Sequence, residues 1–300
     1  MEIEKLHEKY PWLNITTSIE EYVEPKYYDD LLKDYIFDEK ADIQFFEEFL
    51  ETLSNKKDIS VVELGCGSGR ATSIFLEHFK EKNSNLKLID LSSRMLNFCK
   101  NKFIGYNKIG FIKSDSIEFL DKSDELYDVI FSLWSFSHSV HQVLNKKGLN
   151  DGKKYIQSVI EKFIIKNMKK SSNFFLIHFD SLSDEQRILM RQWKKVYPIY
   201  NNTEFQSPSK LLIDEILKSL KERNIISFES NHYKGKEIIY SSDAEALEIF
   251  LNFHMESYFN ESPILPEVID ELLNYFKSFT DKNGLIKIRP GCFVYKINKK

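Results

Sequence analysis

Residues 59–70 read ISVVELGCGSGR, and this stretch decides the fold. A short β-branched run ends at Glu63, and glycines then stand at the alternate positions Gly65, Gly67 and Gly69. The chain contains only ten glycines, so three within five residues mark a turn where the backbone bends tightly or approaches a ligand. A strand that leads into such a turn and then into a helix is typical of the nucleotide-binding corner of an α/β sheet.

The spacing of these glycines argues against a dinucleotide or a phosphate as the ligand of the loop. A dinucleotide site has the pattern Gly-x-Gly-x-x-Gly, which places a pyrophosphate on the helix N-terminus. Here the third glycine comes one residue early, and no Gly-Lys-Ser/Thr follows to grip a phosphate. Glu63 at the strand end suits a cationic amino group better than a phosphate.

Three later segments follow the loop in a fixed order. Each joins an apolar run to polar residues at its end: Asp90 at the end of 86–90, Asp115 and Ser116 after 109–113, and Ser132 at the end of 127–132. Asp90 stands 21 residues after Gly69, and residues 91–96, LSSRML, come directly after it. An acidic side chain at this place can accept hydrogen bonds from both hydroxyls of a ribose.

This ordered set resembles the motifs of the class I S-adenosylmethionine (SAM) methyltransferases. The resemblance implies that Asp90 binds the ribose of SAM and that Asp115 or Ser116 meets the adenine amino group. It also implies a seven-stranded, doubly wound, Rossmann-like α/β sheet whose last strand is antiparallel. The residues that it assigns to the cofactor are Glu63, Gly65, Cys66, Gly67, Asp90, Leu91, Met95, Asp115, Ser116, Ser132 and Leu133.

The composition argues against several other kinds of protein. The net charge of the 300 residues is −4 and the charges are interspersed, so we expect no attraction to nucleic acid. The three cysteines are far apart and predict neither disulfides nor a metal site. The polar start and the short apolar runs predict neither a signal peptide nor a membrane span. We therefore expect a cytoplasmic protein, monomeric or homodimeric, that acts on a small molecule without a metal.

Strands and helices alternate from 59 to 180, which predicts a parallel sheet covered on both faces. We expect strands near 59–64, 86–90, 109–113, 127–133 and 173–179, with a helix over 153–170 before the last of these. After Asp180 the pattern predicts helices over 183–197 and 209–222, strands near 225–229 and 236–240, a helical insertion over 243–279 broken at Pro263 and Pro266, and strands over 285–288 and 292–297. We expect residues 1–50 to form a helical cap, 51–180 the SAM-binding core, and 181–300 the rest of the same sheet with substrate-binding insertions.

The layout of the last third resembles histamine N-methyltransferase and its relatives. The features that carry this likeness are Trp193 with Tyr197, an insertion that holds Phe250, and a closing Cys-Phe-Val-Tyr strand at 292–295. In that family the N-terminal helices and the insertions cover a pocket of aromatic side chains around a small amine. We therefore expect Tyr28, Trp134, Trp193, Tyr197 and Phe250 to contact the substrate, because aromatic faces attract cations.

Methyl transfer from a sulfonium is a direct displacement, so the site has to align a lone pair with the methyl carbon and exclude water. His138 follows the fourth strand and is our candidate for a catalytic base or a substrate hydrogen-bond partner. Acidic residues near the N-terminus, Asp29, Asp30, Glu39 and Asp42, are candidates to pair with an ammonium group. Arg289, just before the last strand, would instead favour a carboxylate or phosphate on the substrate.

The leading prediction is a SAM-dependent methyltransferase that acts on an amine nitrogen of a small metabolite. An O-methyltransferase for a carboxylate or hydroxyl is the alternative, which Arg289 and His138 motivate. An RNA or protein methyltransferase is less favoured, because residues 132–135 read SLWS where an Asn/Asp-Pro-Pro-Tyr/Phe motif would stand.

Overall fold

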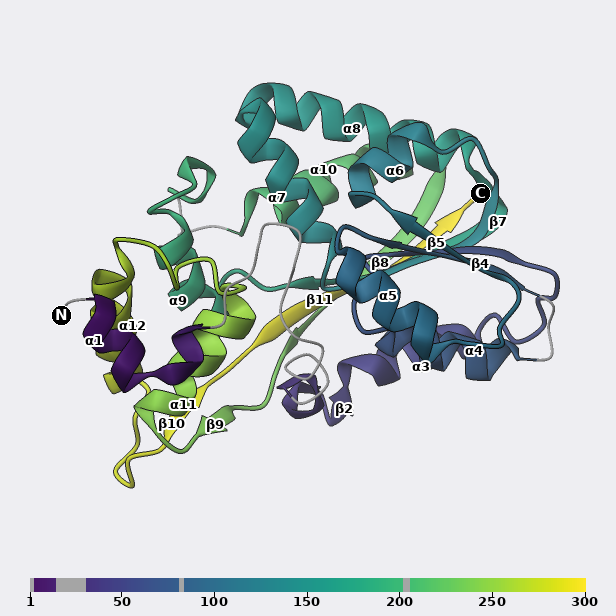
Figure 1. The fold of residues 1–300 in the computed structure, drawn as a ribbon. Coiled ribbons are helices and arrows are strands. Elements are labelled where there is room, and N and C mark those ends of the chain that lie inside the picture. Colours follow the sequence, from purple (N-terminus) through teal and green to yellow (C-terminus); the bar gives the residue numbers. More distant parts are fainter. Residues whose placement is uncertain (1–2, 15–30, 81–83, 202–205) are drawn as a thin grey trace.

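The computed structural model describes residues 3–14, 31–80, 84–201 and 206–300. Its centre is a seven-stranded sheet in the order β5-β4-β3-β6-β7-β11-β8 (Figure 1). The strands are β3 (Ser60–Leu64), β4 (Asn85–Asp90), β5 (Ile109–Lys113), β6 (Tyr127–Leu133), β7 (Met168–Phe179), β8 (Ile226–Lys234) and β11 (Gly291–Lys299). β11 is antiparallel to both β7 and β8. The predicted Rossmann-like sheet with an antiparallel last strand is confirmed.

Helices cover both faces of the sheet. One layer consists of α3 (Asp42–Glu51), α4 (Arg70–Phe79) and α5 (Ser93–Lys102), and the other of α6 (Ser116–Lys122), α7 (Phe136–Lys147), α8 (Leu149–Lys166) and α10 (Pro208–Glu222). Alternate residues of β3 pack against the two helix layers. Val61 belongs to one apolar cluster, and Val62 and Leu64 belong to the other. A strand buried on both sides needs apolar residues at successive positions, which explains the unbroken apolar run.

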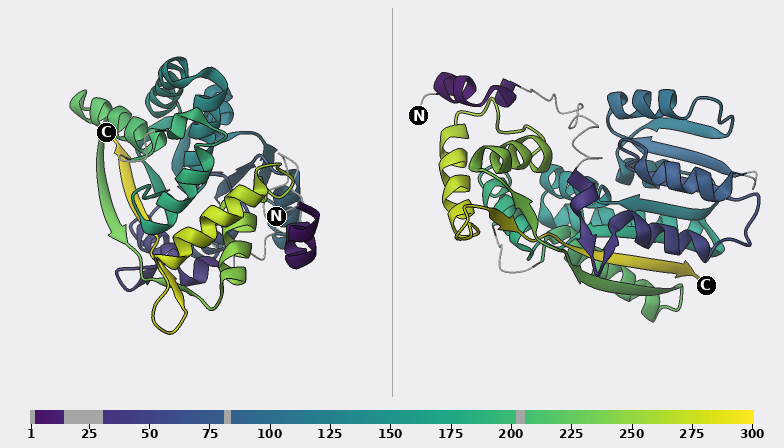
Figure 2. Two further views of the ribbon diagram at one scale, coloured as in Figure 1. Left: turned by 90° about the vertical axis from the view of Figure 1, so that its left-hand side faces the viewer. Right: turned by 90° about the horizontal axis from the view of Figure 1, so that it is seen from below.

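A second group of elements lies beyond the carboxyl ends of the parallel strands, on the left of Figure 1 and of the right-hand view in Figure 2. It contains α1 (Ile3–Lys9), the 3₁₀ turn Pro11–Asn14, α9 (Asp184–Trp193), α11 (Asp243–Glu248), a π-helix (Ile249–His254), α12 (Leu265–Lys277) and the pair β9 (Ile238–Tyr240) and β10 (Ile286–Ile288). Four short elements complete the fold: Leu32–Asp34, β1 (Ile36–Phe37), β2 (Lys40–Ala41) and Pro198–Tyr200. This group stands where ligands bind in open α/β sheets.

Several boundaries differ from the sequence prediction, and two of the differences follow from strand pairing. Residues 168–170 belong to β7, not to the preceding helix, because Met168 pairs with Tyr127 of β6. The run near 236–240 leaves the main sheet, and its strand β9 pairs with β10. The helical insertion is broken as predicted, because residues 255–264 are not helical and α12 starts at Leu265, with Pro266 in its first turn, where a missing N–H costs nothing.

Candidate active site

The glycine loop joins the end of β3 to the first turn of α4. Gly65, Gly67 and Gly69 have φ values of +74°, +50° and +72°, in the left-handed region that only glycine adopts freely. The N–H groups of Gly65 and Cys66 both donate to the carbonyl of Ile89, at 2.8 and 3.0 Å, which ties the loop to β4. A Cβ on Gly65 would stand 1.6 Å from the Oγ of Ser135, so a side chain does not fit there.

Asp90 at the end of β4 is fixed against this loop. Its Oδ2 accepts the N–H of Gly67 and its Oδ1 accepts the N–H of Ser92, both at 2.8 Å. Burial raises the pKa of Asp90, and these backbone hydrogen bonds oppose that effect. Apart from its two chain neighbours, no atom of the described residues lies within 4 Å of the place where a Cβ of Gly67 would stand. The backbone beside the carboxylate therefore borders open space that a ligand can occupy.

Glu63 is 3% exposed beneath the loop. Thr72 in α4 donates its hydroxyl to Oε2 of Glu63 at 2.5 Å. Burial raises the pKa of Glu63 well above its usual value, because a low-dielectric setting disfavours the charged form. This geometry gives Glu63 a positioning role for the start of α4, and its predicted contact with SAM stays a prediction.

The other residues assigned to the cofactor surround these two carboxylates. Cys66 and Met95 are buried, Leu91 is half-buried, and the thiol of Cys99 donates to the carbonyl of Gly67 at 3.2 Å. A hydrogen bond with Cys99, and then burial, raise the pKa of Cys66 well above its usual value. Cys66 therefore stays a thiol, and the sulfur of Cys99 lies against the backbone of the loop.

Asp115 caps the short helix α6. Its Oδ1 accepts the N–H groups of Ile117 and Glu118, at 2.8 and 3.2 Å, and Ser116 is buried. An Asp that precedes a helix stabilises the first turn in this way. The structure thus gives Asp115 a structural partner, and the contact of Asp115 or Ser116 with adenine stays a prediction.

The end of β6 lies directly beside the glycine loop. Ser132 donates its hydroxyl to the carbonyl of Leu64 at 2.6 Å, and half-buried Leu133 follows it. Trp134 then has a φ of +68°, which is uncommon for a bulky residue and costs free energy that the surroundings must offset. Such strain is concentrated at functional sites.

Asp42 is the residue that holds Trp134 in place. Asp42 is fully buried, and its carboxylate accepts hydrogen bonds from the indole Nε1 of Trp134 at 2.7 Å, from the N–H of Ile43 at 2.7 Å and from the guanidinium of Arg70. The expectation that Asp42 pairs with a substrate ammonium is wrong for this structure, because Arg70 already neutralises it. Glu39 similarly pairs with Lys236, at 2.7 Å. Nothing in the sequence pattern pointed to Arg70, which directly follows the loop.

His138 lies near the N-terminus of α7, with its Nδ1 4.0 Å from Oε1 of Glu256. The His138 side chain is 51% exposed, and desolvation by the surrounding protein lowers its pKa to about 4. Burial, and then the charge of Asp90, raise the pKa of Glu256 to about 8. Sequence reasoning missed Glu256, since it belongs to an insertion with no motif.

Aromatic side chains from two distant segments meet near this pair. The ring of Trp193 lies 5.7 Å from that of Tyr197 and 5.3 Å from that of Tyr258, and Tyr197 lies 5.9 Å from Tyr258. We call these three residues the aromatic cluster. The structure brings together Trp193 and Tyr197, as predicted, and adds Tyr258, which the sequence analysis did not single out.

Three other predicted substrate residues have different surroundings. Phe250 is fully buried, with its ring 5.2 Å from that of Phe276, so its contact with a substrate stays a prediction. Arg289 donates to Oε1 of Glu237 at 3.0 Å, and about half of each side chain is exposed. Tyr28 lies outside the described residues, as do Asp29 and Asp30.

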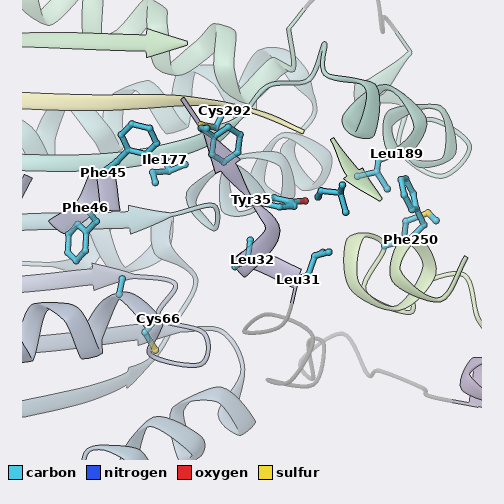
Figure 3. Packing of buried hydrophobic residues seen from close by; sticks show 14 of the residues in the cluster. Leu31, Leu32, Tyr35, Phe45, Phe46, Cys66, Ile177, Leu189, Phe250 and Cys292 are labelled. Carbon is cyan, nitrogen blue, oxygen red and sulfur yellow. The ribbon is translucent and has the colours of Figure 1, made fainter. Parts of the chain in front are cut away.

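A buried polar contact joins the N-terminal segment to the insertions. The hydroxyl of Tyr35 points toward the elements that carry Leu189 and Phe250 (Figure 3) and donates to Oε2 of Glu185 at 2.5 Å. His254 of the π-helix places its Nε2 3.6 Å from the same oxygen. Tyr35 also packs edge-on against Trp134, with the ring centroids 5.7 Å apart. The insertions are therefore connected to the residue that follows β6.

Known proteins resemble the chain mainly through its core. Residues 61–150 match the family model described as a methyltransferase domain. No curated protein sequence matches the chain. None of the described helices is long and apolar enough to cross a membrane.

Several solved structures have a related backbone. The plantazolicin methyltransferase BpumL in complex with SAH is 14% identical with a TM-score of 0.41, over 86% of this chain and 82% of that one. The cyclopropane synthase MmaA2 from Mycobacterium tuberculosis is 13% identical with a TM-score of 0.49, over 87% and 85%. Coclaurine N-methyltransferase bound to N-methylheliamine and SAH is 16% identical with a TM-score of 0.47, over 87% and 71%. At these scores no substrate follows from the likeness.

The assignment therefore rests on this chain's own residues and on the domain match. The left-handed glycine loop, the carboxylate of Asp90 beside open space and the strand order are what a SAM site of this fold requires. The matched domain covers the loop, Asp90, Asp115 and the end of β6. The chain is a SAM-dependent methyltransferase.

Proposed function

We propose that this enzyme transfers a methyl group to an amine nitrogen of a small molecule. The observation that carries the proposal is the group of side chains beyond the end of β6, where His138 lies 4.0 Å from Glu256 and the aromatic cluster includes Tyr197, whose pKa is raised by burial and also by Glu256. A carboxylate with aromatic rings suits a cationic or amine-bearing acceptor. The likeness to histamine N-methyltransferase that the sequence analysis describes is not shown by the comparisons and adds no support to this proposal.

In this proposal, the cofactor and the acceptor are bound by different residues. Asp90 and the loop from Gly65 to Gly69 would hold SAM, which supplies an electrophilic methyl group on a sulfonium. Trp134, fixed by Asp42, and His138 would form the wall next to the acceptor. His138 stays neutral near pH 7, because desolvation lowers its pKa to about 4, so it can accept a hydrogen bond from an N–H of the substrate.

An O-methyltransferase for a carboxylate or hydroxyl is the second candidate. Arg289 motivated it, but the guanidinium of Arg289 already pairs with Glu237 at the surface. His138, the residue first predicted to act as its base, has its pKa lowered to about 4 and would be a weak base for a hydroxyl. The amine acceptor is therefore the better fit.

The test uses methyl-labelled SAM, the purified enzyme, and cell extract divided into small-molecule and macromolecule fractions. We expect label in a small product that survives mild base, whereas a methyl ester would lose it. Label only in RNA or protein would contradict the small-molecule proposal.

Asp90→Ala provides the control for cofactor binding. Because hydrogen bonds to a charged group contribute about 1.5–3 kcal/mol, we expect its affinity for S-adenosylhomocysteine (SAH) to fall roughly 10- to 100-fold in calorimetry. Unchanged SAH binding in this variant would remove Asp90 from the cofactor site.

A further inference from the structure

Side chains from the N-terminal segment hold Trp134 in its strained conformation. The φ of +68° at Trp134 lies in the left-handed region, which a bulky residue occupies only where its surroundings hold it there. Asp42 accepts the indole N–H of Trp134 at 2.7 Å. The rings of Tyr35 and Phe37 contact the same indole, with ring centroids 5.7 and 6.0 Å from it. One polar and two aromatic contacts therefore fix the residue that follows β6.

Glu185 in the first turn of α9 fixes the ring of Tyr35. The hydroxyl of Tyr35 points toward α9, the helix that carries Leu189 (Figure 3), and donates to Oε2 of Glu185 at 2.5 Å. Oε1 of Glu185 accepts the Nε2 of Gln186 at 3.0 Å. Tyr35 and Glu185 are 4% and 3% exposed, and a hydrogen bond to a carboxylate is stronger in such a low-dielectric setting. Burial, and then the charge of Glu185, raise the pKa of Tyr35 well above its usual value, so the phenol keeps its proton and stays a donor.

His254 also lies near Glu185, but it holds the carboxylate less directly. Its Nε2 is 3.6 Å from Oε2 of Glu185 and makes no hydrogen bond to any of the described residues. Desolvation lowers the pKa of His254, against the opposing effect of Glu185, so the ring is neutral near pH 7. The phenol of Tyr35 is therefore the closer partner of this oxygen.

We propose that Glu185 is a positioning residue for methyl transfer. It fixes the ring of Tyr35, and Tyr35 in turn fixes Trp134 on the acceptor side of the site. Glu185 acts through Tyr35 and not by contact with the substrate. The proposal rests on the function proposed above, because the reaction depends on this contact only if Trp134 forms the wall next to the acceptor.

The geometry of the displacement makes the reaction sensitive to this contact. The acceptor lone pair has to be aligned with the methyl carbon, and a misplacement of about 1 Å can lower the rate roughly 100-fold. The cofactor side is held separately, because Asp90 accepts the N–H of Gly67. Loss of the contact between Tyr35 and Glu185 should therefore slow methyl transfer and leave SAH binding unchanged.

The experiment follows Trp134 by ¹⁹F NMR in protein that carries 5-fluorotryptophan. The chain has three tryptophans, and Trp134→Phe identifies the signal of Trp134. Tyr35→Phe removes the hydroxyl and keeps the ring, and Glu185→Ala removes the acceptor. We expect both variants to shift or broaden the Trp134 signal and to leave the other two in place. Glu185→Gln, which keeps an acceptor oxygen, should give a Trp134 signal close to that of the wild type.

The rate of methyl transfer is measured with the same variants. Methyl-labelled SAM at saturating concentration is supplied with the small-molecule fraction of cell extract. We expect the initial rate to fall about tenfold in Tyr35→Phe and Glu185→Ala, to stay within threefold of the wild type in Glu185→Gln, and SAH affinity in calorimetry to stay within twofold throughout. The double variant should be no slower than the slower single variant, because both changes remove one contact.

Tyr295→Phe is the matched control. It removes another buried phenol–carboxylate hydrogen bond, from Tyr295 to Asp214 at 2.7 Å, and Tyr295 belongs to the other apolar cluster. This variant should leave the Trp134 signal and the rate unchanged.

An unmoved Trp134 signal in Tyr35→Phe and Glu185→Ala would overturn the proposal. An equal shift in Tyr295→Phe, or a shift without a slower rate, would do the same. A wild type that labels no small molecule would instead refute the proposed function, and the ¹⁹F signal would still decide whether Glu185 holds Trp134. Tyr35→Phe, which keeps the packing of the ring, carries the test if Glu185→Ala does not fold.

Discussion

The cofactor side and the acceptor side of the cleft are built in different ways. On the cofactor side, the contacts join residues close in sequence, such as Gly67 with Asp90 and Thr72 with Glu63, 23 and 9 positions apart. On the acceptor side, they join Asp42 with Trp134 and Tyr35 with Glu185, 92 and 150 positions apart. The first side follows from local backbone geometry, while the second depends on the packing of the whole chain. Changes on the acceptor side can therefore alter the substrate without disturbing the cofactor.

Gly65→Ala should have the largest effect, because the cofactor side has no room at this position. A Cβ would lie 1.6 Å from Oγ and 2.4 Å from Cβ of Ser135, and left-handed strain and overpacking together cost about 2–5 kcal/mol. We expect calorimetry to show SAH binding weakened about 100-fold or more. Gly105→Ala, also at positive φ but with nothing within 4 Å of its Cβ, should cost only the strain. Ser135→Gly added to Gly65→Ala should restore part of the binding, and no rescue would refute the steric cause.

Asp42→Asn should have the next largest effect and tests how the acceptor side is held. It leaves the partly buried Arg70 without its counter-charge, and removing one partner of a buried pair costs about 3–5 kcal/mol. Arg70 is about a quarter exposed, so we expect the free energy of unfolding in urea to fall by about 2–3 kcal/mol. Glu48→Gln breaks an exposed pair with Lys40 and should cost less than about 1 kcal/mol. An equal decrease in the free energy of unfolding for the two variants would show that the buried pair of Asp42 and Arg70 contributes no more than an exposed ion pair.

Glu256→Gln should stabilise the protein at alkaline pH. The folded protein raises the pKa of Glu256 from 4.5 to about 8, so the folded state binds more protons and stability falls as pH rises through this interval. The amide removes that loss, and we expect a gain of about 1–3 kcal/mol at pH 8.5 and little change at pH 4.5. Thermal unfolding of both proteins across this range measures it. A pH-independent difference would show that Glu256 titrates normally.

Arg289→Gln should have the smallest effect of the four. Arg289 and Glu237 are about half exposed, and surface ion pairs contribute about 0–1 kcal/mol. We expect the melting temperature and the kcat/KM for the amine acceptor to stay within about 2 °C and twofold of the wild type. A tenfold rise in KM would instead restore the prediction that Arg289 binds an anionic group of the substrate.

The match between sequence and structure is best where local rules act. Glycines at alternate positions and an acidic residue at the next strand end required a particular loop, and the structure has it. The same reasoning failed at residues 168–170, where pairing with β6 determines the strand, and near 236–240, whose strand β9 pairs with β10 outside the main sheet. Asp42 looked available for a substrate because its partners, Arg70 and Trp134, belong to elements that only folding brings near.

The sequence by itself determined the fold class, the cofactor and the cofactor side of the cleft, because strand ends, positive φ angles and helix caps are short-range properties of the chain. The tertiary structure decided the acceptor side. It paired His138 with Glu256, joined Trp193 and Tyr197 to Tyr258, and used Asp42 to hold Trp134. These contacts join residues about 60 to 120 positions apart and depend on how the insertions pack against the sheet, which no local pattern specifies.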